Sequence, residues 1–154
     1  VLLWLDEQPE AGNLKWLKKK VRAGYIKPYL KPEIADYYKA LEHGGLEVNK
    51  ERYLRMRAWW AGNDKRRDTE IMSTLSSREK ANLKALEGFM DLSDLSDRLR
   101  AAEIKRELGQ FDQALDLLMD VLGEELAHVV IRIAELAREQ DPYVREIERE
   151  SVVG

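Results

Sequence analysis

The stretch from Arg98 to Leu122 constrains the fold of this chain more than any other. It holds two runs of apolar residues at spacings of three, four and seven, separated by Gly109 and Gln110. Such spacing is typical of two amphipathic helices joined by a tight turn. Seven side chains are expected to face inward on the two helices: Leu99, Ala102, Leu108, Phe111, Ala114, Leu118 and Val121. The stretch therefore predicts an antiparallel helical hairpin, the unit from which stacked α-helical scaffolds are built.

The second helix of this hairpin resembles the corresponding helix of a tetratricopeptide repeat. The positions that carry the resemblance are Gly109, Phe111, Asp112, Gln113, Ala114, Leu118 and Val121. The first helix departs from the family, because Arg98 and Lys105 stand where Trp and Tyr are usual. Ala101 and Ala102 stand where a Leu-Gly pair is usual, and only Ala102 fits, as a small residue. No second copy is found at the family's 34-residue spacing. The resemblance implies stacked hairpins that bind a protein or peptide, and it covers about 25 of the 154 residues.

Two phrases in the chain, RAWWAGND and ELGQFDQALDLL, are also similar to uncharacterised bacterial α-helical proteins. Some of those proteins carry a short zinc-binding ribbon ahead of such a region. This sequence has no cysteine, so such a ribbon is absent from it. The similarity implies an all-α protein of bacterial type and names no activity.

Composition favours a single helical domain. Hydrophobic residues make up 44% and charged residues 36% of the chain, which suits a globular helical protein with charged outer faces. The absence of cysteine is compatible with a reducing compartment, and we expect a cytoplasmic protein. No apolar run approaches the length of a membrane-spanning helix, and the opening VLLWL lacks the features of a signal peptide. Because the sequence does not begin with methionine, the possibility of a preceding domain in a longer protein stays open.

The whole chain, residues 1–154, is expected to form one all-α domain of antiparallel hairpins, stacked as a tetratricopeptide-like array or bundle. Proline, glycine and capping residues divide it into four parts. These are an extended lead-in at 1–12, the first helices at 13–62, a linker at 63–75 and a tetratricopeptide-like half at 76–150.

Local signals predict where the helices begin and end. In the first part, one helix is expected at 32–43, opened by Pro32 and ended by Gly44 and Gly45, and another at 49–61, capped by Asn49 and ended by Gly62. In the second half, Ser76 and Glu79 fit a capping box, and Asp94 caps the first helix of the hairpin. A last long helix begins near Leu126 and stops before Pro142.

Residues suited to catalysis or metal binding are sparse. Glu124 and His128 lie one helical turn apart and would supply two ligands, whereas a catalytic zinc ion usually needs three. The only other histidine is His43, far along the chain. No cysteine, serine elbow or phosphate-binding glycine loop is present. We therefore expect no enzyme, no cofactor and no metal.

The sequence offers two surfaces for a partner. The first is a groove between hairpins, and its expected lining residues are Tyr37, Tyr53, Arg57 and Trp60. The favoured interpretation of Trp59 and Trp60 is that both are core anchors, and the alternative is that one of them edges this groove. The second surface is an acidic stripe on the exposed side of the second hairpin helix, at Asp112, Asp116 and Asp120, which would receive basic side chains. The leading expectation is a non-enzymatic scaffold that binds a protein or peptide.

The alternative function is nucleic-acid binding by a basic segment at 15–31. Its cations include Lys15, Lys18, Lys19, Lys20 and Arg22. Trp16, Tyr25 and Tyr29 are interleaved with them, and lysines with aromatic rings suit phosphates and stacked bases. A net charge of −3 for the whole chain argues against this function, because nucleic-acid-binding domains are usually basic.

Overall fold

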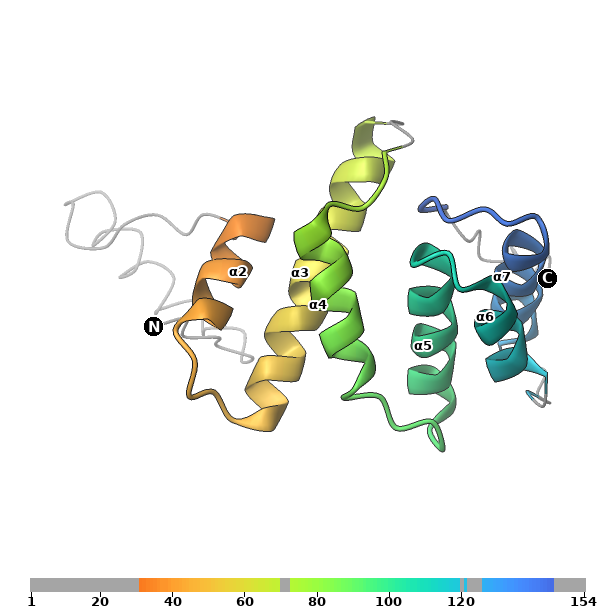
Figure 1. The fold of residues 1–154 in the computed structure, drawn as a ribbon, viewed down its shortest axis with the longest axis horizontal. Helices are drawn as coiled ribbons and strands as arrows, with labels where there is room; N and C mark the ends of the chain where they lie inside the picture. The colour runs from red at the N-terminus through yellow and green to blue at the C-terminus, as the bar shows by residue number, and fades with distance from the viewer. Residues whose placement is uncertain (1–30, 70–72, 120, 122–125, 146–154) are drawn as a thin grey trace, which may run out of the picture. The chain divides into compact units, whose positions relative to one another are not determined.

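The computed structural model describes residues 31–69, 73–119, 121 and 126–145, with only the backbone described at 68 and 69. The chain divides into two units, 1–31 and 32–154, and the helices below belong to the second. The described residues form α2 (Ile34–Glu42), α3 (Val48–Thr69), α4 (Ser77–Glu87), α5 (Leu95–Glu107), α6 (Phe111–Leu118) and α7 (Ala127–Arg138), shown in Figure 1. The prediction of an all-α helical array is confirmed, and the described part of the chain contains no strand.

Each helix packs against the next one along the chain, from α2 to α7, and α5 also packs against α7. The predicted hairpin at 98–122 corresponds to α5 and α6. Gly109 makes the turn between them in the left-handed region, at φ +75°, where a glycine avoids the steric cost that other residues meet. Of the seven side chains predicted to face inward, Leu99, Ala102, Ala114 and Leu118 are buried and the others are half-buried.

The two predicted caps of the second half are confirmed. The Ser76 hydroxyl accepts a hydrogen bond from the Glu79 backbone N–H at 3.3 Å, and the Glu79 carboxylate accepts one from the Ser76 N–H at 2.8 Å. The Asp94 carboxylate accepts from the Asp97 N–H at 2.9 Å and opens α5. As expected, α7 ends before Pro142, at Arg138. Local capping chemistry therefore determines where these helices begin and end.

Two predicted helix starts were wrong by one or two residues. Pro32 is not the first residue of α2, because Glu33 is the N-cap and forms a capping box with Asp36. Asn49 does not cap α3, because that helix already begins at Val48.

The predicted end of α3 at Gly62 was also wrong, because the helix continues to Thr69. Gly62 is buried, and a Cβ atom added to it would lie 2.8 Å from Glu79 Oε1 and 3.1 Å from Ile34 Cδ1. This glycine therefore permits close packing of side chains from α2 and α4. The first half of the predicted linker at 63–75 is helical, and among the described ones only its last residues, from Ser73, lie outside a helix.

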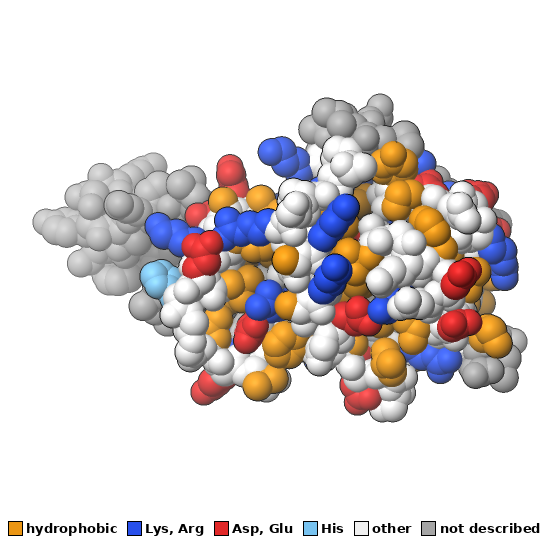
Figure 2. Space-filling view, viewed as in Figure 1, with side chains coloured by type: hydrophobic (Ala, Val, Ile, Leu, Met, Phe, Trp, Pro, Cys, Tyr) orange, Lys and Arg blue, Asp and Glu red, His pale blue; other side chains and the backbone are white. Residues whose placement is uncertain are grey.

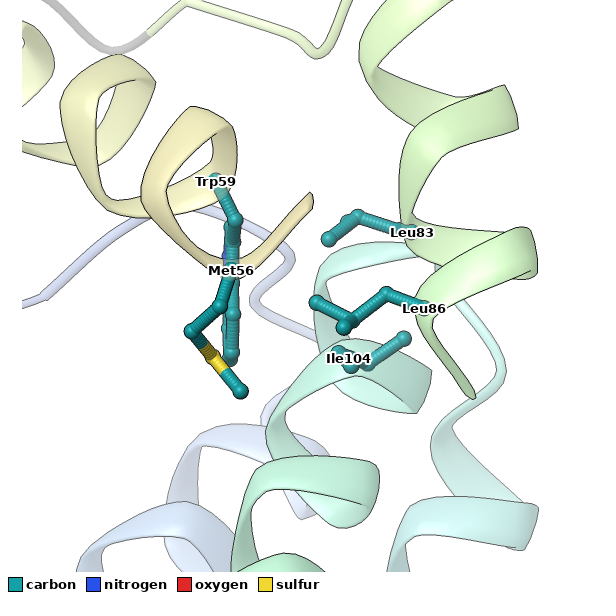
Figure 3. Close-up of a cluster of buried hydrophobic side chains, with 5 residues drawn as sticks. All are labelled: Met56, Trp59, Leu83, Leu86 and Ile104. Atoms are coloured by element: carbon teal, nitrogen blue, oxygen red, sulfur yellow. The ribbon is translucent and has the colours of Figure 1, made fainter. Parts of the chain in front are cut away.

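Three hydrophobic clusters follow one another along the array. The first joins α2 to α3 and contains Tyr37, Tyr38, Leu54 and Ala58. The second joins α3, α4 and α5, whose side chains Met56, Trp59, Leu83, Leu86 and Ile104 point toward one another in Figure 3. The third joins α5, α6 and α7 and contains Leu99, Ala102, Leu118, Ile133 and Ala134. Helices α3 and α5 each contribute to two clusters.

Both signs of charge occur on the face shown in Figure 2, where Lys, Arg, Asp and Glu side chains lie among apolar ones. None of the described helices combines the length and the apolar character needed to cross a lipid bilayer.

Candidate functional site

A groove of about 450 Å³ lies between α3, α5, α7 and the segment that follows α7. On each of the three helices the groove-lining side chains include pairs four residues apart, so that one face of each helix lines the groove. The lining residues are Trp59, Trp60, Asn63, Arg67, Leu99, Arg100, Glu103, Glu107, Val129, Ile133, Val144 and Arg145. Six of these twelve residues are polar or charged and the others are apolar, and the volume lies within the range of ligand pockets.

Polar side chains bridge α3 and α5 at the inner part of this groove. Glu107 is 4% exposed, and its Oε2 accepts a hydrogen bond from Trp59 Nε1 at 2.9 Å. Its Oε1 accepts another from Asn63 Nδ2, also at 2.9 Å. Further along the same two helices, Arg52 Nη2 lies 2.5 Å from Asp97 Oδ1. These contacts hold the two walls of the groove in register.

Glu107 has an altered acidity. The pKa of its carboxyl is raised to about 7, mainly by burial and also by the nearby charge of Glu103. Hydrogen bonds from Trp59 and Asn63 and the charge of Arg106 oppose the rise without cancelling it. The groove therefore contains a buried acid that changes charge near neutral pH.

Arg106 fixes the wall formed by the segment after α7. Its side chain is fully buried, with Nε 2.8 Å from Glu103 Oε2 and Nη2 2.5 Å from Glu103 Oε1. Its Nη1 donates to the carbonyl of Tyr143 at 2.9 Å and also to the carbonyl of Asp141. All three guanidinium nitrogens are thus occupied, and residues 141–145 are held against α5.

Three further arginines line the groove, and each is paired with an aspartate. Arg67 pairs with Asp64, Arg100 Nη1 lies 2.9 Å from Asp97 Oδ1, and Arg145 Nη2 lies 2.7 Å from Asp141 Oδ2. These arginines are more exposed than Glu107. The positive charges of the groove are therefore its more exposed ones, each paired with an aspartate, whereas the buried Glu107 makes the inner part acidic.

The structure separates Trp59 from Trp60. Both line the groove, but Trp59 is 7% exposed and belongs to the α3–α4–α5 cluster, as expected, whereas Trp60 is 41% exposed. The favoured expectation that both are core anchors was wrong, and the alternative that one edges a groove is confirmed. Successive helical residues point about 100° apart, so Trp59 can be buried in a cluster while its neighbour Trp60 stays exposed.

The other predicted groove residues on α2 and α3 lie elsewhere. Tyr37 is buried in the α2–α3 cluster, and Tyr53 is exposed but is not among the groove-lining residues. Arg57 is half-buried, and its Cζ lies 6.0 Å from the ring centroids of both Tyr37 and Trp60. Arg57 therefore connects the core tyrosine to the groove tryptophan by cation–π contacts.

The predicted acidic and basic surfaces are only partly described. Asp112 and Asp116 are exposed on α6, as expected, and neither lines the groove. Asp120 and the basic residues Lys15, Lys18, Lys19, Lys20 and Arg22 lie outside the described residues, so nucleic-acid binding by that segment stays a prediction. Glu124, half of the considered metal pair, also lies outside them. Within the described ranges, no three side chains of the metal-ligating types gather at one point.

A second hollow, of about 470 Å³, lies beside Gly62 and the start of α4. Tyr38 and Arg66 line it, and Arg66 Nη2 lies 2.7 Å from Glu79 Oε1. The Tyr38 hydroxyl is buried and has no hydrogen-bond partner in the described part of the chain. Burial, together with the charge of Glu79, raises the pKa of Tyr38 to about 12.

Sequence reasoning missed the polar residues of the groove. Asn63 lay in the predicted linker, and neither Arg106 nor Glu107 was given a role in the predicted core or at a predicted surface. A signal was present for Glu107, because Leu99, Glu103 and Glu107 follow one another at four-residue steps on one face. Arg106 also follows Ala102 by four residues and Leu99 by seven, on the predicted inward face, but its carbonyl partners come from beyond α7 and could not be predicted.

The chain was compared with protein-family models, curated proteins and solved structures, and nothing in any of the three matches it.

Proposed function

We propose that this chain is a non-enzymatic helical scaffold that binds a peptide segment of a partner protein in the α3–α5–α7 groove. The observation that carries the proposal is Trp60, a large aromatic side chain left 41% exposed at the groove. Tryptophan is enriched among the residues that dominate binding energy, above all where it meets a well-packed apolar surface. Leu99, Val129 and Ile133 supply such a surface here.

The hairpin of α5 and α6 supports a scaffold of the tetratricopeptide-like kind. Gly109 adopts a positive φ between the helices, and Ala114 is fully buried where the two helices approach. Both features are what the resemblance implies for a stacked hairpin. Under this proposal the chain works without a cofactor, and the lack of cysteine suits a cytoplasmic setting.

The proposal is tested by selecting peptides from a random display library on the immobilised 154-residue chain. The affinity of each selected peptide is then measured by fluorescence anisotropy. We expect Trp60→Ala to weaken binding by about 30-fold, which corresponds to a hot-spot loss of about 2 kcal/mol. Ile131→Ala is the matched control, because Ile131 is an exposed apolar residue of α7 that does not line the groove. Circular dichroism checks that both variants are folded.

Other outcomes point to other surfaces. Peptides that tolerate Trp60→Ala but are lost in Asp116→Lys would place the binding site on the acidic stripe of α6. Failure to select any peptide contradicts the proposal. Retention on single-stranded DNA that falls steeply with added salt would favour the nucleic-acid alternative at 15–31.

A further inference from the structure

The inner part of the groove has a hydrogen-bond acceptor that the described residues leave unused. Asn63 lines the groove and is 7% exposed, and its Nδ2 donates to Glu107. Its Oδ1 is buried and has no partner among the described residues. Rotating the amide would turn Oδ1 toward the Glu107 carboxylate, which is itself an acceptor, so the observed orientation is the favourable one. A buried acceptor of this kind is best satisfied by a donor that arrives with a ligand.

Among the described residues, no cationic side chain forms a salt bridge with the carboxylate of Glu107 beside it. Both hydrogen bonds that the described residues donate to Glu107 come from neutral groups, Trp59 and Asn63. The neighbouring Arg106 directs its nitrogens to Glu103 and to two backbone carbonyls. Burying a carboxylate is costly unless a positive charge or several hydrogen bonds offset it. A cationic ligand would therefore be stabilised at this point.

The other charged groups at the groove determine how the sign of its charge changes with depth. Glu103 adds negative charge on α5, next to Glu107. On the outer side, Arg67, Arg100 and Arg145 carry positive charge, and each is paired with an aspartate. An incoming cation thus passes neutralised arginines and reaches two glutamates, one of them paired with Arg106. The acceptor on Asn63 and the carboxylate of Glu107 together favour a donor-rich cation.

We propose that the groove binds an arginine side chain of the partner peptide, with its guanidinium on Asn63 Oδ1 and Glu107 and its stem along Trp60. This inference rests on the proposed peptide-binding function. A guanidinium presents several N–H donors in one plane, and it stacks on aromatic rings more readily than an ammonium does. A free small cation would leave the apolar wall of the groove uncovered, whereas a peptide side chain with its neighbours covers it.

The experiment uses the peptides selected on the intact chain. Each arginine of a selected peptide is replaced in turn by citrulline, which keeps the shape and removes the charge. We expect one such replacement to weaken binding by about 10- to 100-fold, as is typical when a charge-assisted hydrogen bond is lost. Replacing the same arginine by lysine should weaken binding less than citrulline does, because the positive charge remains.

The protein side is tested with Glu107→Gln, and Glu47→Gln, at an exposed loop glutamate, is the control. Glu107→Gln should weaken the arginine peptide by about 10- to 100-fold and leave the citrulline peptide nearly unchanged, so that the two changes are coupled. With the unaltered chain, affinity for the arginine peptide should fall as the pH is lowered from 8 to 6. With Glu107→Gln this dependence should disappear, which a purely structural role of Glu107 would not produce.

The outcomes separate the two proposals. Peptides that bind and depend on Trp60, but that show no arginine dependence and a flat pH profile, would overturn the arginine site and leave peptide binding standing. Failure to select any peptide would overturn both. Arginine dependence that survives Glu107→Gln would show that another acid, outside this site, receives the side chain.

Discussion

Arg106 and Glu107 are neighbours in the sequence and have opposite surroundings. The guanidinium of Arg106 meets a carboxylate and two carbonyls, so its charge is well compensated. The carboxyl of Glu107 meets two neutral donors and lies near the charge of Glu103, so its ionised form is disfavoured. Their sequence positions do not show which partners each side chain would meet. The difference arises from the helices and carbonyls that pack around each.

The acidity of Glu107 predicts how stability depends on pH. Its pKa is raised from 4.5 to about 7 in the folded chain, so its stabilising contribution is complete below about pH 4.5 and is lost as the pH rises through 7. The full loss would be about 3 kcal/mol at 1.36 kcal/mol per pKa unit. Glu107→Gln removes this titration and should be more stable than the unaltered chain at pH 8 and similar to it at pH 5. Urea unfolding at the two pH values measures the difference.

The matched control for that comparison is again Glu47→Gln, whose carboxyl is exposed, and it should follow the unaltered chain at both pH values. A glutamine variant that loses stability at pH 8 relative to the unaltered chain would show that Glu107 is needed as an anion in the fold.

At the scale of elements, the local signals of the sequence were reliable where the chain itself supplies the partner. The Ser76–Glu79 box, the Asp94 cap and the Gly109 turn each depend on residues within a few positions, and all three are present. The prediction that α3 ends at Gly62 was wrong because the role of this glycine depends on Ile34 and Glu79, which approach from other helices. A glycine chosen for close packing and one that ends a helix look alike in a sequence.

The close packing around Gly62 predicts the effect of Gly62→Ala. Helix propensity alone would favour alanine by about 1 kcal/mol. The added Cβ would lie 2.8 Å from Glu79 Oε1, which accepts from Arg66, and Oε2 of the same carboxylate accepts from Ser76, so the group is expensive to move. We expect a net loss of about 1–2 kcal/mol in the free energy of unfolding, since overpacking costs about 1–3 kcal/mol. Urea denaturation measures it.

Two variants calibrate that measurement. Ala81→Gly, at an exposed position of α4, reports the propensity term alone and should cost about 0.5–1 kcal/mol. In a Glu79→Ala background the loss caused by Gly62→Ala should shrink, because the closest contact is gone. A gain in stability from Gly62→Ala in the unaltered background would mean that the neighbouring side chains yield without cost.

At the scale of the whole molecule, the groove combines residues from Trp59 to Arg145, and this is why the sequence predicted so little of it. Helical periodicity identified the hairpin and its buried face. For Trp60 the sequence left two interpretations, a core position and a position at the edge of a groove. It did not show which helices would face each other across a cavity. The acid and amide of the groove, Glu107 and Asn63, become recognisable as a pair only when α3 lies opposite α5.

Arg106 predicts how the last described segment is retained. Arg106→Met removes a fully buried cation and leaves Glu103 and two carbonyls without their donor. We expect a loss of about 3–5 kcal/mol, the usual cost of breaking a buried charge pair on one side. Amide hydrogen exchange should rise most at residues 141–145. Arg138→Met, at an exposed arginine of α7, should leave both measurements unchanged. Equal exchange in the two variants would show that the segment is held by other contacts.

The sharing of α3 and α5 between successive clusters has a consequence for how a disturbance spreads. In such a row each helix is coupled to the one or two helices nearest to it along the chain, so the free energy is close to a sum of local terms. Opening of α2 removes one term and leaves the cluster around α7 intact. Loss of α5, by contrast, removes members of two clusters at once and divides the row into two pieces. The wall of the groove that carries Glu103 and Glu107 is therefore also the helix on which the continuity of the array depends.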